Sequence, residues 1–318
     1  MKSSEKQARE SSFTANKTVT AIGEVLWDIT PNGSFPGGAP FNTAVHLSRL
    51  GVPTRFISRV GADREGRDLQ EIITRHKLPV EHIQTDPTHP TGKVTVSFPE
   101  PDRPCYNIAH PAAWDFIEPP EPKYQTGLLL HGTLALRGEK TRQTIWQLRR
   151  NADQIVLDLN LRPPFTQWKI IRQAISGADW LKVNEEELAA LKGWLNWEGT
   201  SRSVAEKLLN HFKLRGICIT KAAKGAAFLN GNDWFEHPGY AVKLGDPVGA
   251  GDAFLAGFIF GLLQGWSGVK ILETANALGA LVAAEKGAIP SLPPAVWDKL
   301  KNGNPAPLFL DRISDGQK

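Results

Sequence analysis

Cysteine is scarce in this chain, since Cys105 and Cys218 are the only two among 318 residues. Two isolated cysteines exclude a disulfide framework and a cysteine-based metal site, and they suit a reducing compartment. Long apolar runs are also missing, and the polar residues 1–17 contain no apolar core of the kind found in signal peptides. We therefore expect a cytoplasmic protein without membrane partners, in which residues 1–17 and 309–318 are disordered tails.

A strong charge of one sign is absent as well. The 37 Lys and Arg residues and the 33 Asp and Glu residues give a formal net charge of +4, and the basic residues are scattered. This distribution argues against nucleic acid as a partner. No G-x-x-x-x-G-K-[ST] motif occurs, which excludes a P-loop enzyme, and the dinucleotide-binding glycine pattern is incomplete. The hydrophobic fraction of 41% and the length suit one large globular domain, which we place at residues 18–308.

The glycine-rich run G-D-P-V-G-A-G-D-A-F at residues 245–254 is the most informative stretch that is present. It places Asp252 at the tip of a turn that opens an apolar helix. A helix start carries unpaired N–H groups and a partial positive charge, so it can hold a phosphoryl group. The small residues Gly249, Ala250 and Gly251 let the backbone approach an anion closely. An ordinary glycine turn with an acidic helix cap remains the alternative at this point.

Apolar strands alternate with helical patterns along most of the chain, which indicates a mainly parallel α/β sheet. The strands are expected at residues 19–28, 54–61, 127–132, 154–158, 180–183 and 216–220, and the helices at residues 40–50, 64–76, 139–150, 168–176, 185–191 and 201–212. Residues 83–117 interrupt this rhythm, because residues 93–98 alternate and prolines flank them. We expect short antiparallel strands there, which form a small inserted β-lid together with residues 29–40.

A second glycine motif, P-G-G-A-P-F-N at residues 36–42, precedes a helix that ends at Gly51. Together the two motifs resemble the two signatures of the ribokinase-like carbohydrate kinases of the phosphofructokinase-B type. They occur in the family's order, and the resemblance extends from about residue 18 to residue 293. It implies a ribokinase-like fold, with a mainly parallel sheet flanked by helices and a β-lid, and an ATP-dependent sugar kinase.

The resemblance implies a role in catalysis for four residues of the first motif. Asp252 would be the base that takes a proton from the sugar hydroxyl, and the N–H groups of Gly249, Ala250 and Gly251 would form the anion hole. The first helical turn favours the ionised form of a carboxylate, which is the form that a base needs. A plain helix cap is the alternative for Asp252.

The second motif and a later D-x-N-x-R element supply the expected sugar site. The residues that match the family's sugar-binding positions are Asp28, Gly37, Gly38, Asn42, Asn160 and Arg162. Carboxylate and amide groups can satisfy several sugar hydroxyls, glycines admit the ring, and a guanidinium suits an anionic group. The alternatives are a turn residue for Asp28, a helix-start residue for Asn42 and a surface salt bridge for Arg162.

Further matches concern the nucleotide and the ions. The resemblance assigns Asn184, Thr220, Gly225, Asn276, Gly249 and Gly251 to ATP, Glu187 to Mg²⁺ through water, and Asp246, Val248 and Ser291 to a monovalent cation such as K⁺. Ala222 stands where the family has the first glycine of its T-x-G-x-x-G element. An acidic helix start is the alternative for Glu187, and an amide on a helix face is the alternative for Asn276.

The substrate is suggested by four shorter segments. Residues 23–28, 90–94, 112–115 and 131–137 look most like fructokinases, which predicts phosphorylation of the primary 6-hydroxyl of fructose. Another sugar or a sugar acid such as 2-keto-3-deoxygluconate, a nucleoside, and a non-catalytic kinase-like scaffold are the alternatives. The exposed edges expected of a β-lid also suggest a homodimer formed through the lid.

Overall fold

The computed structural model describes residues 17–31, 33–100, 103–120, 126–306 and 308–309. The expected tails at residues 1–17 and 309–318 therefore lie outside the described residues, apart from Lys17 and Phe309. No helix in the described ranges is long and apolar enough to cross a bilayer.

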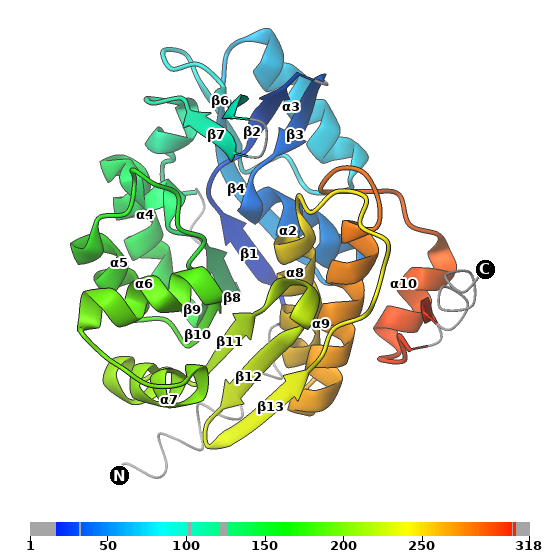
Figure 1. Cartoon of the computed structure of the whole chain (residues 1–318). Coiled ribbons are helices and arrows are strands. Elements are labelled where there is room, and N and C mark those ends of the chain that lie inside the picture. The colour runs from blue at the N-terminus through cyan, green and yellow to red at the C-terminus, as the bar shows by residue number, and fades with distance from the viewer. Residues whose placement is uncertain (1–16, 32, 101–102, 121–125, 307, 310–318) are drawn as a thin grey trace.

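A nine-stranded sheet forms the centre of the molecule (Figure 1), and the expected mainly parallel architecture is confirmed. In spatial order its strands are β13 (Asp233–His237), β12 (Ala226–Asn230), β11 (Gly216–Thr220), β10 (Trp180–Asn184), β9 (Ala152–Asp158), β8 (Thr126–His131), β1 (Val19–Ile22), β4 (Thr54–Gly61) and β5 (Ile83–Asp86). All neighbours from β11 to β5 pair in parallel, whereas β12 pairs antiparallel with both β11 and β13. This hairpin was not predicted from the sequence, although the two residues between its strands, Gly231 and Asn232, are a typical hairpin signal.

Helices cover both faces of the large sheet, which explains why its central strands are almost continuously apolar. One face packs against α2 (Ala39–Arg49), α3 (Arg64–Arg75), α8 (Ala250–Leu263), α9 (Gly268–Ala283) and α10 (Pro294–Lys301). The other face packs against α4 (Glu139–Arg149), α5 (Trp168–Ile175), α6 (Glu185–Leu195) and α7 (Ser201–Phe212). Helix α8 is buried from Ala253 to Leu263 because it packs against the sheet between α2 and α9 (Figure 1).

A second sheet of four strands lies above the carboxyl edge of the large sheet (Figure 1). Its order is β3 (Gly33–Gly37), β2 (Leu26–Thr30), β6 (Gly92–Glu100) and β7 (Arg103–Ile108). The two central strands, β2 and β6, pair in parallel, and each pairs antiparallel with its outer neighbour. We call these four strands the small sheet.

The structure corrects three boundaries expected from the sequence. Residues 19–28 do not form one strand, because β1 ends at Ile22, the chain turns at Gly23 with φ +152°, and β2 begins at Leu26. Asp28 therefore belongs to the small sheet. Strand β5 was expected in the lid but pairs with β4 in the large sheet, and the segment expected at residues 29–40 ends earlier because α2 begins at Ala39.

Candidate active site at the carboxyl edge of the large sheet

The first turn of α8 forms one wall of the site. Gly249 is its N-cap with φ +78°, and a Cβ at this position would overlap Ala288, so that only glycine fits. The N–H of Ala250 donates to the Pro247 carbonyl at 3.3 Å. Within the described residues, the N–H of Gly251 has no backbone acceptor. The glycine N–H groups are thus available to an anion, whereas that of Ala250 is already engaged, contrary to expectation.

Helix α2 brings a second set of residues to Asp252. The Asn42 Nδ2 group donates to Asp252 Oδ2 at 2.8 Å, although the two residues lie 210 positions apart in the sequence. Asn42 Oδ1 is buried and has no hydrogen-bond partner among the described residues. Burial raises the pKa of Asp252 to about 6, although the hydrogen bond from Asn42 opposes this shift. A carboxylate with a raised pKa, held by an amide, is suited to accept a proton near neutral pH.

The double glycine before α2 is required by close contacts with two acidic residues. A Cβ on Gly37 would overlap the Asp28 carboxylate, and a Cβ on Gly38, which has φ +119°, would overlap the Glu24 carbonyl. Burial raises the pKa of Asp28 to about 6, against the effect of the Arg162 charge. The structure thus places Asp28 and both glycines at the start of the helix that carries Asn42.

The D-x-N-x-R element follows β9. Asn160 adopts φ +35°, and Arg162 is exposed and forms no salt bridge with any described residue, so its surface ion-pair alternative finds no support. The positive charge of Arg162 lowers the pKa values of Asp28, Glu24 and Asp252. The Arg162 charge therefore acts on the carboxylates at the predicted sugar site.

The N-x-x-E element forms the start of α6. Asn184 is the N-cap, and its Oδ1 accepts from the Glu187 N–H at 2.8 Å. The Glu187 carboxylate accepts from the N–H groups of Asn184 (2.8 Å) and Leu161 (2.9 Å). This capping box matches the helix-start alternative for Glu187. Each carboxylate oxygen keeps a further lone pair, which could accept a hydrogen bond from a magnesium-bound water.

Near the predicted nucleotide site, two backbone positions have positive φ. Gly225 has φ +80°, and a Cβ there would overlap the His237 carbonyl. Ala222 has φ +49°, a left-handed conformation that a glycine would adopt more readily and that costs alanine about 1 kcal/mol. Thr220 ends β11 beside them, whereas the Asn276 amide is buried and donates to the Leu272 carbonyl at 2.8 Å. The helix-face alternative for Asn276 therefore describes its observed contact.

The two loops that were expected to bind a cation, one with Asp246 and Val248 and the other with Ser291, lie against each other. Asp246 accepts from the N–H groups of Val248 (3.0 Å) and Gly287 (3.1 Å), and Ser291 lies exposed beyond them. In the parts of the chain that the structure describes, no cluster of three or more His, Cys, Asp or Glu residues is placed to hold a metal. Any cation here would rely largely on backbone carbonyls.

Three residues that lie near this site, His46, Arg49 and Glu24, were not predicted from the sequence. His46 and Arg49 of α2 form hydrogen bonds with the loop that carries Ser291, through the carbonyls of Ala288 (2.9 Å) and Pro290 (2.8 Å). Glu24 is buried, and burial raises its pKa to about 7. The helical spacing of Asn42, His46 and Arg49, which puts them on one face of α2, could have pointed to the first two.

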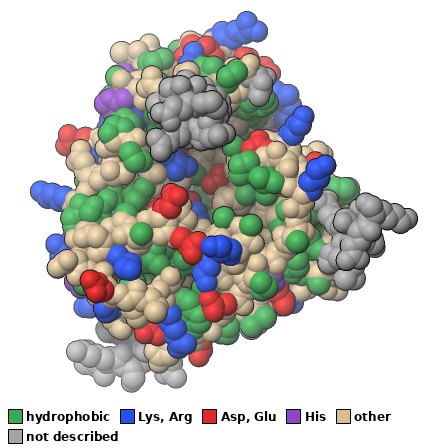
Figure 2. Space-filling view, viewed as in Figure 1, with side chains coloured by type: hydrophobic (Ala, Val, Ile, Leu, Met, Phe, Trp, Pro, Cys, Tyr) green, Lys and Arg blue, Asp and Glu red, His purple; other side chains and the backbone are tan. Residues whose placement is uncertain are grey.

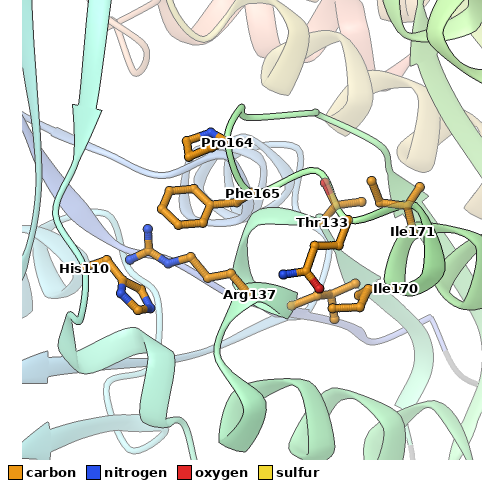
Figure 3. Close-up of a pocket in the computed structure, with 9 residues that line it drawn as sticks. His110, Thr133, Arg137, Pro164, Phe165, Ile170 and Ile171 are labelled. Carbon is orange, nitrogen blue, oxygen red and sulfur yellow. The ribbon is translucent and has the colours of Figure 1, made fainter.

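Figure 2 shows the surface hollowed between the small sheet and the rest of the molecule, with acidic side chains in the hollow. A separate cavity of about 220 Å³ lies between the loops that follow β8 and β9. In Figure 3, Arg137 lines this cavity beside Phe165, with His110 nearby. Arg137 is its only permanently charged lining residue and is already paired with Asp115, so this cavity is poorly suited to bind phosphate.

The sequence model of the pfkB family of carbohydrate kinases matches residues 23–295. The chain belongs to this family. As a pfkB-family carbohydrate kinase it is a phosphotransferase that uses an alcohol group as acceptor, and the glycine turn of Asp252 and the double glycine before α2 both lie inside the matched region.

Several individual pfkB-family relatives are similar over most of the chain. The fructokinase of Escherichia coli is 28% identical over 298 residues, which cover 86% of this chain and 96% of the relative. A fructokinase variant from Vibrio cholerae O395, solved with fructose, ADP and potassium ion, has a TM-score of 0.77 at 28% identity and covers 89% of this chain and 98% of its own. The aminoimidazole riboside kinase of Salmonella enterica, solved with aminoimidazole riboside and an ATP analog, has a TM-score of 0.76 at 25% identity. The match covers 89% of this chain and 99% of the Salmonella enterica chain.

Proposed function

We propose that this enzyme uses ATP to phosphorylate the primary 6-hydroxyl of fructose, with Asp252 as the base. The hydrogen bond that joins Asn42 to Asp252 carries the proposal, because it unites the base with the predicted sugar-binding helix at an anion-binding turn. The fructose complex of the Vibrio cholerae enzyme and the fructokinase relatives support fructose as the substrate.

In this mechanism the residues of the chain position a hydroxyl and move one proton. Asp28 and Asn42 bind sugar hydroxyls, and Asp252 accepts the proton of the attacking hydroxyl as the new O–P bond forms. The Gly249 and Gly251 N–H groups, with the positive end of the α8 dipole, stabilise charge on the phosphoryl group. Asn160 and Arg162 close the sugar side of the site.

The nucleotide and ions would occupy the opposite side of the Asp252 turn. We assign Asn184, Thr220 and Gly225 to ATP, with Asn276 in the wall of its site. Magnesium, when bound, neutralises charge on the phosphates, and Glu187 would hold it through water. Asp246, Val248 and Ser291 would hold K⁺, the ion present in the Vibrio cholerae complex. The small sheet would act as the lid over the sugar and as a dimer contact through its exposed edge.

A nucleoside is the second candidate substrate. The aminoimidazole riboside kinase matches this chain almost as well as the fructokinases do, which favours a ribose-containing acceptor as the alternative. A sugar acid such as 2-keto-3-deoxygluconate is the third acceptor. The intact Asp252 turn argues against a non-catalytic scaffold.

The experiment that tests the proposal combines a substrate screen with one substitution. Purified enzyme is assayed with ATP, magnesium and a panel of fructose, other sugars, sugar acids and nucleosides. Asp252→Asn keeps the shape of the side chain but removes the base, so we expect turnover of the preferred acceptor to fall at least about 100-fold.

The matched control is Asp298→Asn, an exposed aspartate on α10, which should leave turnover unchanged. Near-normal turnover by a folded Asp252→Asn enzyme would rule out the assigned base. Preference for a nucleoside would replace fructose as the substrate and leave the mechanism in place.

A further inference from the structure

Lys182 lies in the middle of the large sheet, where a lysine is unexpected. It belongs to β10, and its neighbours in register are Asp158 on β9 and Cys218 on β11. Central strands of a parallel sheet are normally apolar, and a buried ammonium is costly unless it is paired. Only 8% of the Lys182 side chain is exposed. A charge kept in such a position calls for a physical reason.

The position of the ammonium is fixed from two sides. Lys182 Nζ donates to Asp158 Oδ1 at 2.9 Å, and the Asp158 side chain is 5% exposed. On the opposite side, a Cβ built on Gly251 would lie 3.6 Å from Nζ. The ammonium therefore sits between the sheet and the first turn of α8, directly behind the predicted anion hole. A larger side chain at Gly251 would crowd it.

Three charged groups act on Asp252 in the described structure. Asp158 carries the same sign of charge as Asp252 and opposes its ionisation, whereas Lys182 and Arg162 favour it. Glu24 also lies near Asp252, whose negative charge raises the pKa of Glu24. Arg162 is exposed, so solvent weakens its effect. Lys182 is buried and acts through a medium of low polarity, where a charge has a stronger effect.

We propose that Lys182 is a positioning residue for phosphoryl transfer: its ammonium, held against α8 by Asp158, keeps Asp252 ionised. The proposal rests on the proposed role of Asp252 as the base. Asp158 then has a double effect, because it orients the ammonium and at the same time opposes ionisation of the base. The direction in which a substitution moves the pH profile follows from these signs.

The test is the pH dependence of kcat/KM for the preferred acceptor, at saturating ATP and magnesium. The acidic limb of the wild-type profile is expected near pH 6, where Asp252 loses its proton. Lys182→Met removes the favourable charge, so the limb should move up by about one pH unit. The loss should be about 5-fold at pH 6, approach about 10-fold below pH 5, and be much smaller at pH 8.

Asp158→Asn gives a second test that keeps the ammonium. It removes the opposing charge, so the acidic limb should move to lower pH, opposite to the shift in Lys182→Met. The pair of opposite shifts cannot arise from general destabilisation, and Asp158→Asn keeps the proposal testable if Lys182→Met does not fold. Arg59→Met is the matched control, because it breaks the buried Arg59–Asp86 pair on β4 and β5 and should leave the limb in place.

A uniform loss of kcat/KM at every pH in Lys182→Met, with the limb unmoved, would overturn the proposal and indicate direct contact with the phosphoryl group instead. An unmoved limb in a folded Asp158→Asn enzyme would overturn it as well. Both of these results can be distinguished from failure of the proposed function. If only the role of Lys182 were wrong, Asp252→Asn would still lower turnover at least about 100-fold.

Discussion

The ion pairs Arg137–Asp115 and Lys182–Asp158 are both buried, but they use their donors differently. Arg137 Nε and Nη2 reach both Asp115 oxygens at 2.8 and 3.0 Å, and Nη2 also reaches the Ala109 carbonyl at 2.7 Å. Its guanidinium lies 3.8 Å from the Trp114 ring centroid. Lys182 makes one described hydrogen bond, to Asp158.

The difference separates a pair that holds the fold from the pair that we propose to serve the reaction. A forked guanidinium bound at two points fixes one geometry and joins two loops, one after the small sheet and one after β8. A compact ammonium with one described partner leaves its charge available to Asp252. The substitutions below should therefore change different measured quantities.

The largest effect on stability is expected from Arg137→Met. It leaves Asp115 buried without its cation, which typically costs about 3–5 kcal/mol of unfolding free energy. Urea unfolding measures the loss, and the pH profile of the remaining activity should be unchanged. Lys140→Met is the control, because the Lys140–Glu118 pair is about half exposed and should contribute at most about 1 kcal/mol. Equal losses in the two variants would remove the distinction drawn for Arg137.

A smaller effect, on binding rather than stability, is expected from Asp28→Ala. Loss of a charged hydrogen-bond partner typically costs about 1.5–3 kcal/mol, or roughly 10- to 100-fold in sugar affinity. ATP affinity should hardly change, since Asp28 lies on the small-sheet side of the site. Calorimetric titration with each ligand measures both. Equal weakening of sugar and ATP would contradict the assignment of Asp28.

The smallest effect is a gain of stability in Asp252→Asn. The pKa of Asp252 is raised to about 6 in the folded state, so the folded state loses stability as pH rises through that value. Removing the charge should raise the free energy of unfolding at pH 8 and leave it almost unchanged at pH 4, where the carboxyl is protonated in the folded state. Thermal unfolding at the two pH values measures this. A lower melting temperature at pH 8 would show that Asp252 is not under electrostatic strain.

The fold was largely predictable because its strands and helices are encoded by local patterns. The alternation of apolar strands and helices predicted the parallel sheet, and Pro40 and Gly51 marked the ends of α2. The break after Ile22 was not predictable in the same way, since Val25 and Leu26 continue the apolar run. Strand β5 was misplaced because its short, partly polar sequence gives little sign of which strand it pairs with.

The site was predictable where a motif carried it and not where its geometry depends on register. Asp252 and Asn42 came from motifs, and the structure brings them into contact. Lys182 looked like an ordinary residue of an alternating strand, and only its register with Asp158, 24 positions away, reveals the pair. Asn276 was assigned from a motif, but its amide is used within its own helix.

The parallel pairing of β2 with β6 also limits how the small sheet can be exchanged between relatives. Its strands come from two separate segments, Leu26–Gly37 and Gly92–Ile108, and neither outer strand pairs with the other segment. Transplanting one segment alone would pair the new hairpin with an unmatched host strand at the β2–β6 boundary, and a two-stranded hairpin that loses this pairing is only marginally stable in water. A chimaera in which the small sheet is exchanged must therefore receive both segments from the same relative.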